Sequence, residues 1–329
     1  RRLTAALVGR SSASTVQFRR EVPAPEGAGL QNFYSSFLAP ATRLTKRRCR
    51  PEGIRFPWKE FPERAINNGQ RMIQLTSKAA RIAYSIIASI IIILIWRNIG
   101  LATTLLDIPG NSIPGLSIKA LLLTLVTLGL TIIVIKPKEL FSFLGLSRNI
   151  LHGLGLALLC VLPLYLVFLF LGDINIELTF PVFYDKCILT GFKEELVFRA
   201  FMFGMLFRYA KTGFFWAVIL PALYFGSVHL YQGHDVVSAL ATFGVTFIGA
   251  LYFSWMYAEW DFNIWIPAGL HILMNGAWFI FTMEGTEIAA GGLISNIARI
   301  ISIALAIALT FYHHKKRGGK LFDYPIWSL

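Results

Sequence analysis

Charged residues are scarce in this chain. They make up 15% of its 329 residues, whereas 55% are hydrophobic; a soluble domain carries about 25% charged residues. Apolar runs near the length that crosses a bilayer recur from about residue 80 onward, without the alternation typical of strands. Because backbone groups in lipid must be hydrogen-bonded within the chain, the sequence predicts an all-α polytopic membrane protein.

Cysteine and several known motifs are also lacking. The three cysteines are odd in number, and Cys160 and Cys187 fall in apolar segments, which excludes a disulfide framework. The chain has neither the His-Glu-x-x-His of helix-borne zinc proteases nor a Gly-x-Ser-x-Gly elbow. It also shows no internal repeat, which disfavours a transporter built from inverted halves.

The basic excess of the chain is concentrated near the N-terminus. Residues 1–71 hold 14 Lys/Arg and 5 Asp/Glu, and residues 72–329 hold 17 and 13. The net charge of +13 therefore gives no indication of nucleic acid binding. The first methionine is Met72. We expect 1–71 to be a disordered extension, either a targeting segment or sequence upstream of a natural start at Met72, and 72–329 to form one transmembrane domain.

Eight transmembrane helices are expected within that domain. Their ranges are Ala80–Trp96, Ile118–Ile135, Ile150–Leu171, Phe183–Phe207, Phe214–Leu230, Val237–Tyr257, Ile264–Phe281 and Ile294–Tyr312. Basic residues cluster before the first helix, in alternate loops and after the last helix. Since such loops face the cytoplasm, we expect a multi-pass protein of the cell membrane, in bacteria the inner membrane, with both termini cytoplasmic. The sequence does not indicate an oligomeric state.

Two adjacent glutamates interrupt the fourth expected helix. An ionised residue in the hydrocarbon layer costs about 2.5–3.5 kcal/mol on insertion scales. Glu195 and Arg199 are four residues apart and can pair on one helix face. Glu194 is rotated by about 100° from Glu195, which leaves it as the freer carboxylate and a candidate proton acceptor. The alternative is that Glu195 and Arg199 form an ion pair whose only role is in helix packing, and that Glu194 lies at the membrane interface.

Three further polar residues lie in later apolar segments: His229, His271 and Asn275. Each could be an interfacial or packing residue, but together with the glutamates they suit water activation or metal binding. His271 and Asn275 are four apart and share a helix face. One carboxylate with two imidazoles is a usual zinc ligand set, whereas an asparagine amide is a good oxyanion donor. The residues leave metal-bound water and direct activation both open.

The three motifs resemble, in order, those of the CPBP family of intramembrane proteases, which includes the CAAX prenyl endopeptidases and is also called the Abi group. They are Glu194-Glu195-x-x-x-Arg199, Phe225-x-x-x-His229 and His271-x-x-x-Asn275, preceded by Phe143-Leu144-Gly145-Leu146. The resemblance covers roughly residues 140–282. It implies an eight-helix fold whose site lies in a cavity open toward the cytoplasm.

The resemblance also implies roles for these residues. Glu194 and His229 would activate water to hydrolyse a peptide bond, and His271 and Asn275 would stabilise the oxyanion. Because the family is classed as metallopeptidase, Glu194, His229 and His271 are candidate zinc ligands. The substrate would be a peptide or a prenylated protein. The alternatives are a non-proteolytic scaffold or bacteriocin-immunity protein on the same fold, and an ion or proton transporter, since intramembrane Glu and His also mark ion pathways.

Overall fold

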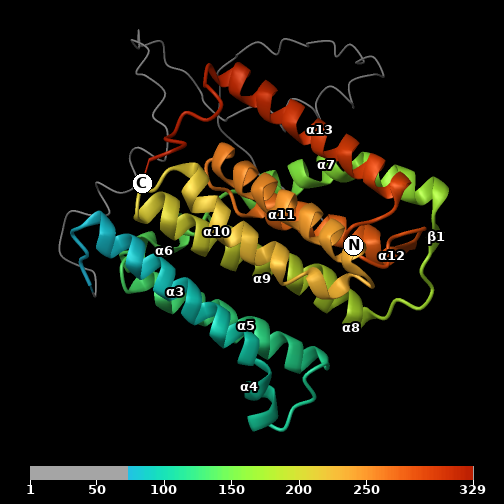
Figure 1. The fold of residues 1–329 in the computed structure, drawn as a ribbon, viewed down its shortest axis with the longest axis horizontal. Coiled ribbons are helices and arrows are strands. Elements are labelled where there is room, and N and C mark those ends of the chain that lie inside the picture. The colour runs from blue at the N-terminus through green and yellow to red at the C-terminus, as the bar shows by residue number, and fades with distance from the viewer. Residues whose placement is uncertain (1–72, 329) are drawn as a thin grey trace, which may run out of the picture. The chain divides into compact units, whose positions relative to one another are not determined.

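The computed structural model describes residues 73–328. The expectations for residues 1–71, including the start at Met72, lie outside the described residues. Helices make up most of the described chain (Figure 1). Their bounds are α3 Lys78–Asn98, α4 Gly100–Leu105, α5 Ile113–Ile132, η1 Pro137–Glu139, α6 Leu140–Phe143, α7 Ile150–Leu171, α8 Phe180–Phe183, η2 Tyr184–Leu189, α9 Thr190–Glu195, η3 Leu196–Phe203, η4 Met205–Tyr209, α10 Phe214–Ser227, η5 Leu230–Gln232, α11 Val236–Glu259, α12 Trp265–Ile280 and α13 Leu293–Arg317.

The helical fold class is confirmed, with one small addition. Strand β1 (Asp173–Ile174) pairs antiparallel with β2 (Phe281–Thr282), so that Asp173 lies opposite Thr282. This two-residue ladder joins the chain after α7 to the chain after α12. Pairs of this length carry no hydrophobic period that a sequence could reveal.

Polar residues set the starts of several long helices. The side chains of Ser77, Asn149 and Asp235 each accept a hydrogen bond from the backbone N–H three residues further on, which satisfies a donor that the first turn leaves free. Gly318 ends α13 with a φ of 65°, the left-handed conformation that glycine adopts without a steric penalty. The boundaries of these helices therefore follow from the sequence.

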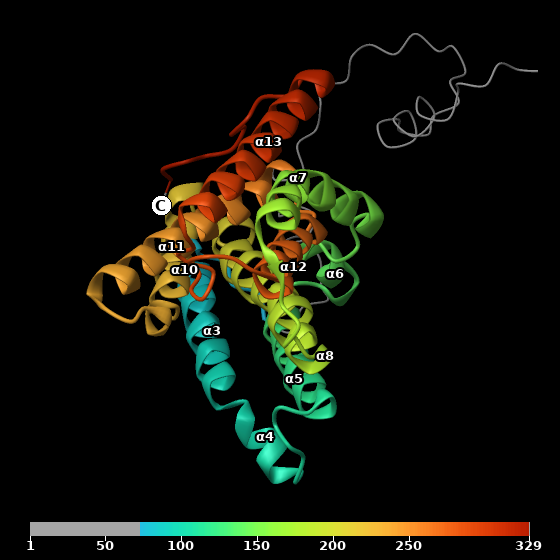
Figure 2. The ribbon, with the colours of Figure 1, turned by 90° about the vertical axis from the view of Figure 1, so that its right-hand side faces the viewer.

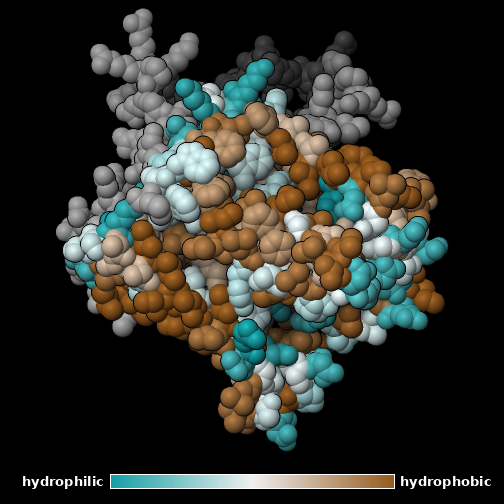
Figure 3. Space-filling model, viewed as in Figure 1, coloured by the Kyte–Doolittle hydropathy of each residue, from teal (hydrophilic) through white to brown (hydrophobic). Residues whose placement is uncertain are grey.

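Six helical segments are long and apolar enough to cross a membrane: Lys78–Asn98, Ile113–Ile132, Ile150–Leu171, Phe214–Gln232, Val236–Glu259 and Leu293–Arg317. The protein is thus a multi-pass membrane protein. Large apolar side chains cover much of the face drawn in Figure 3, as expected of a surface that meets lipid. Leu151, at 78% exposed, and Phe170, at 77%, are examples on α7.

The fourth and seventh expected spans are helical but are not among these six. Residues 180–209 form one continuous helical stretch, α8 to η4, in which the η segments have π-helical i→i+5 bonding. This stretch, named here the 180–209 helix, carries seven ionisable acidic or basic side chains. Helix α12 has 16 residues, fewer than the roughly 20 that span a bilayer.

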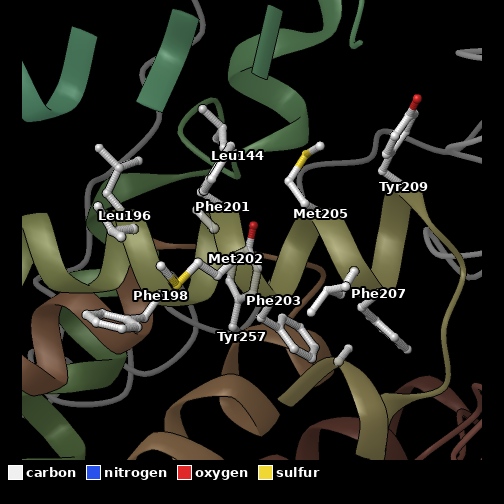
Figure 4. Close-up of a cluster of buried hydrophobic side chains, with 14 of the residues drawn as sticks. Leu144, Leu196, Phe198, Phe201, Met202, Phe203, Met205, Phe207, Tyr209 and Tyr257 are labelled. Atoms are coloured by element: carbon white, nitrogen blue, oxygen red, sulfur yellow. The ribbon is translucent and has the colours of Figure 1, made fainter. Parts of the chain in front are cut away.

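The 180–209 helix lies inside the protein rather than against lipid. Residues 195–210 are all buried. The helix contacts α3, α5, α10, α11 and α12, and Figures 1 and 2 show these elements around it. Figure 4 shows its apolar side chains, among them Phe201 and Phe203, packed with Leu144 and Tyr257 from other elements. The buried charged residues Glu195, Arg199 and Arg208 therefore meet protein, which removes most of the penalty for placing them in a membrane.

Glycines bring the site-bearing helices into backbone contact. A Cβ atom on Gly191 of α9 would lie 2.8 Å from the backbone nitrogen of Ile272 of α12. A Cβ atom on Gly153 of α7 would lie 2.9 Å from the carbonyl carbon of Trp265, also on α12. Helix α12 is thus held closely between α7 and α9, and His271 is brought next to the two glutamates.

The C-terminal residues attach to the start of α10. The carbonyl oxygens of Pro325 and Ile326 accept hydrogen bonds from the backbone N–H groups of Phe214 and Phe215, at 2.9 and 3.0 Å. The Tyr324 hydroxyl donates to a carboxylate oxygen of Glu259 at 2.7 Å. Burial, and next the Glu259 charge, raise the pKa of Tyr324, which keeps this hydroxyl a donor. The tail thus fixes the N-terminus of α10, the helix that leads to His229.

Candidate active site

Glu195 and Arg199 form the buried ion pair that their spacing predicts. The Nη1 atom of Arg199 lies 2.9 Å from Oε1 of Glu195, and the two side chains are 1% and 0% exposed. A buried pair that lost one partner would leave an uncompensated charge, at a cost of about 3–5 kcal/mol. Both groups are therefore fixed parts of the interior.

His271 shares the same carboxylate oxygen. Its Nδ1 atom lies 2.7 Å from Oε1 of Glu195, although the two residues are 76 positions apart in the chain. Its Nε2 atom lies 3.8 Å from Oε2 of Glu194. A histidine that donates from Nδ1 to a carboxylate is fixed in its ring orientation. The second ring nitrogen of His271 is thereby directed at the neighbouring glutamate.

Glu194 is the less constrained of the two carboxylates. Its side chain is 13% exposed. Its Oε2 atom is buried and, like Oε2 of Glu195, has no hydrogen-bond partner among residues 73–328. Such an acceptor is costly to leave unsatisfied, so it is a natural place for a water molecule or a substrate group. Glu194 is thus the more exposed of the two carboxylates.

His229 lies just beyond the end of α10. Its Nδ1 atom is 2.6 Å from the carbonyl oxygen of Phe225, and its ring centroid is 4.6 Å from the Phe225 ring. The Phe225 ring in turn lies 6.4 Å from the ring of His271. The Phe225 ring thus lies near both imidazoles, and the carbonyl contact leaves Nε2 as the nitrogen of His229 that can act on another group.

Asn275 is one turn beyond His271 and is bound to the 180–209 helix. Its Nδ2 atom donates to the carbonyl oxygen of Lys186 at 2.9 Å. Lys186 belongs to the π-helical segment η2. One N–H of the amide thus joins α12 to that helix, which leaves the other N–H for an oxyanion.

The proposed zinc ligands do not form a metal centre in this geometry. Within residues 73–328, no group of three or more His, Cys, Asp or Glu side chains is placed to hold a metal ion. Glu194 and His271 are neighbours, but within the described residues His229 does not join them in a group that could hold a metal ion. A protein zinc site needs ligand atoms at about 2.0–2.3 Å from one point. The donor set therefore does not fit zinc, and no chemical step is assigned to a metal.

One residue near the site carries no signal in the sequence beyond its residue type. Phe253 of α11 places its ring 5.3 Å from the Arg199 guanidinium and 5.7 Å from the ring of His271. An aromatic residue in an apolar helix is ordinarily a packing residue. The sequence alone could not single it out.

Two contacts explain the Phe143-Leu144-Gly145-Leu146 segment that precedes the motifs in the sequence. Arg208 donates to the carbonyl oxygen of Phe143, and its guanidinium lies over the Phe262 ring at 4.1 Å. The Trp265 indole N–H donates to the Leu146 carbonyl oxygen at 3.2 Å. The segment thus supports the start of α12, and hence the helix that carries His271.

Comparison with known proteins places these residues in a family. Residues 175–277 match the family model "Type II CAAX prenyl endopeptidase Rce1-like", and all six expected site residues fall within this range. The chain is also similar to the "Putative membrane peptidase YdiL" of Bacillus subtilis (strain 168), at 34% identity over 91 residues. That alignment covers 28% of this chain and 33% of the relative. No solved structure matches. Residues 175–277, which hold the buried Glu-Glu-Arg-His cluster, therefore belong to the Rce1-like type II CAAX prenyl endopeptidase (CPBP) family.

Proposed function

We propose that the protein is an intramembrane endopeptidase that hydrolyses a peptide bond of a membrane-associated or lipidated substrate. One observation carries the proposal: a partly accessible carboxylate, Glu194, faces an imidazole, His271, whose other nitrogen is held by the buried Glu195–Arg199 pair. A carboxylate base beside a positioned imidazole is an arrangement for general acid–base catalysis. A helix-packing pair would not require the second glutamate or the histidine.

The reaction uses the chain's own residues. Glu194, assisted by His229, takes a proton from water, and the water oxygen bonds to the carbonyl carbon of the scissile peptide. His271, in its cationic form with a proton on each ring nitrogen, donates from Nε2 to the developing oxyanion while Glu195 balances its charge, and the remaining N–H of Asn275 adds a second donor. The C–N bond then breaks, and Glu194 returns the proton to the leaving amine. Arg199 acts through Glu195 and does not contact the substrate.

The membrane arrangement follows from the distribution of basic residues. We infer eight membrane segments, in which the 180–209 helix and α12 cross the membrane together with the six apolar spans. The basic residues of the loops after α5 and η4 and of the segment after α13 then lie on the cytoplasmic side. In this arrangement both termini are cytoplasmic, and a bacterial protein of this kind would reside in the inner membrane.

The substrate class comes from the family alone. The matched family is described as prenyl endopeptidase, so a peptide with a lipidated cysteine is the first substrate to test. A non-proteolytic scaffold or bacteriocin-immunity protein would bind such a peptide without cleaving it. An ion or proton transporter would use Glu194 and His271 as part of a conduction path, but would have no need of a second glutamate fixed by Arg199.

A cleavage assay with the purified protein tests the proposal. The full chain is reconstituted in liposomes and incubated with farnesylated, geranylgeranylated and unmodified peptides, and the products are identified by mass spectrometry. We expect an internal cleavage of at least one lipidated peptide and none with His271→Ala. Binding without cleavage by folded protein would favour the scaffold, and a proton flux that His271→Ala abolishes would favour the transporter.

A further inference from the structure

Arg199 is a buried cation with few hydrogen bonds. It is 1% exposed, and within the described residues its Nε and Nη2 atoms have no hydrogen-bond partner. Among residues 73–328, only Nη1 is engaged, by Glu195 at 2.9 Å. A guanidinium has five N–H donors in a fixed plane, so one bond does not determine the orientation of that plane. Another contact must hold it.

Two aromatic rings supply that contact. The guanidinium carbon of Arg199 lies 4.6 Å from the ring centroid of Phe225 and 5.3 Å from that of Phe253. A cation within about 6 Å of an aromatic face is attracted by the ring quadrupole, most strongly where water is excluded. The two rings come from different helices, α10 and α11. Together they stabilise the positive charge of the Arg199 guanidinium, which makes few hydrogen bonds.

The same two rings flank His271. Its ring centroid is 5.7 Å from Phe253, at an interplanar angle of 45°, and 6.4 Å from Phe225, at 73°. The Oε1 atom of Glu195 joins Arg199 to His271, at 2.9 and 2.7 Å. The position of the guanidinium thus sets that of the carboxylate, which in turn sets the direction of the imidazole.

We propose that Phe253 is a positioning residue for the Glu194–His271 pair, a role that rests on the proposed peptidase function. Its aromatic face holds the Arg199 cation from the side of α11 and packs against His271. Phe225 also contacts His229, so a change there would disturb several groups at once. Phe253 allows the guanidinium and His271 to be tested without direct contact with His229.

Removal of the aromatic face should slow the reaction more than it weakens substrate binding. In Phe253→Leu and Phe253→Met the side chain stays apolar but loses the quadrupole, and Arg199 and Glu195 can shift. We expect kcat to fall by about 10- to 100-fold, the scale of a displacement of about 1 Å in a catalytic group, with KM nearly unchanged. Phe253→Tyr keeps the face and should restore most of kcat.

A matched control separates positioning from loss of packing. Phe201 of η3 is 0% exposed and lies in the large apolar core around the 180–209 helix, whereas Phe253 belongs to a separate apolar cluster. Phe201→Leu removes a similar volume and should lower the thermal stability by a similar amount, but should leave kcat close to that of the unmodified protein. Equal kcat losses in Phe253→Leu and Phe201→Leu, with no rescue by Phe253→Tyr, would overturn the proposal.

A spectroscopic measurement does not depend on the substrate. In the full-length protein labelled with ¹⁵N-histidine, with His271→Gln used for assignment, the ring of His271 should show one fixed form with a proton on Nδ1. Phe253→Leu should give a mixture of forms, and Phe201→Leu should not. If the unmodified protein cleaves no peptide but shows this difference, the peptidase function fails and the positioning role stands. An unchanged His271 signal in Phe253→Leu contradicts the positioning role.

Discussion

The residue scale shows which contacts a sequence can predict. The Glu195–Arg199 pair follows from a separation of four positions on one helix. The bond between Glu195 and His271 does not, because it joins residues 76 positions apart on two helices. The periodicity of a sequence predicts on which face of its own helix a residue lies. It does not predict which other helix packs against that face. The sequence therefore identified the polar groups but not the shared carboxylate oxygen.

Metal independence is the prediction at this scale. Since Glu194, His229 and His271 do not converge on one point among the described residues, we expect the active, detergent-purified protein to contain no stoichiometric zinc, cobalt or manganese. Treatment with a chelator should leave its cleavage rate unchanged. Elemental analysis of the active fraction checks this. Metal at one equivalent per chain, lost together with activity and restored with it, would show that the three side chains rearrange around an ion.

At the scale of elements, length and apolarity predict the helices on the outside of the protein and fail for those inside. The six apolar spans agree with the expected ranges to within a few residues at most ends. The 180–209 helix and α12 depart from a simple span because their surroundings are protein, which tolerates charge and a length of 16 residues. The π-helical turns likewise depend on tertiary contacts and leave no periodic trace in the sequence.

The contact between α9 and α12 should be sensitive to a single methyl group. Gly191→Ala places a Cβ atom 2.8 Å from the backbone nitrogen of Ile272, so the helices must separate. Overpacking of this kind costs about 1–3 kcal/mol. We expect a lower Tm in detergent and a lower cleavage rate, because α9 carries both glutamates and α12 carries His271.

Gly249→Ala on α11 is the matched control. No atom lies within 4 Å of its added Cβ. Alanine is favoured over glycine in a helix by roughly 0.5–1 kcal/mol, so this variant should be as stable as the unmodified protein or slightly more stable. A Gly191→Ala protein with the same Tm and activity as Gly249→Ala would show that the α9–α12 contact is looser than described.

At the scale of the whole molecule, the structure arranges a polar interior within an apolar exterior. The six spans present apolar side chains outward, whereas Glu195 and Arg199 of the 180–209 helix are buried against side chains of α10, α11 and α12. The composition predicts a membrane protein whose apolar segments contain a few polar residues, but it does not predict that these residues lie in the interior. The central place of the 180–209 helix comes from the packing of residues distant in the chain, which sequence alone does not specify.

The central claim is that the two adjacent glutamates have different roles, and one comparison tests it directly. The cleavage rate and the Tm are measured for Glu194→Gln and Glu195→Gln in the same detergent. Glu194→Gln removes the base and should lower the rate by about 100-fold or more, with the Tm unchanged. Glu195→Gln leaves Arg199 without its counter-charge, a loss of about 3–5 kcal/mol, and should lower both. Variants that lose rate and Tm equally would contradict the account.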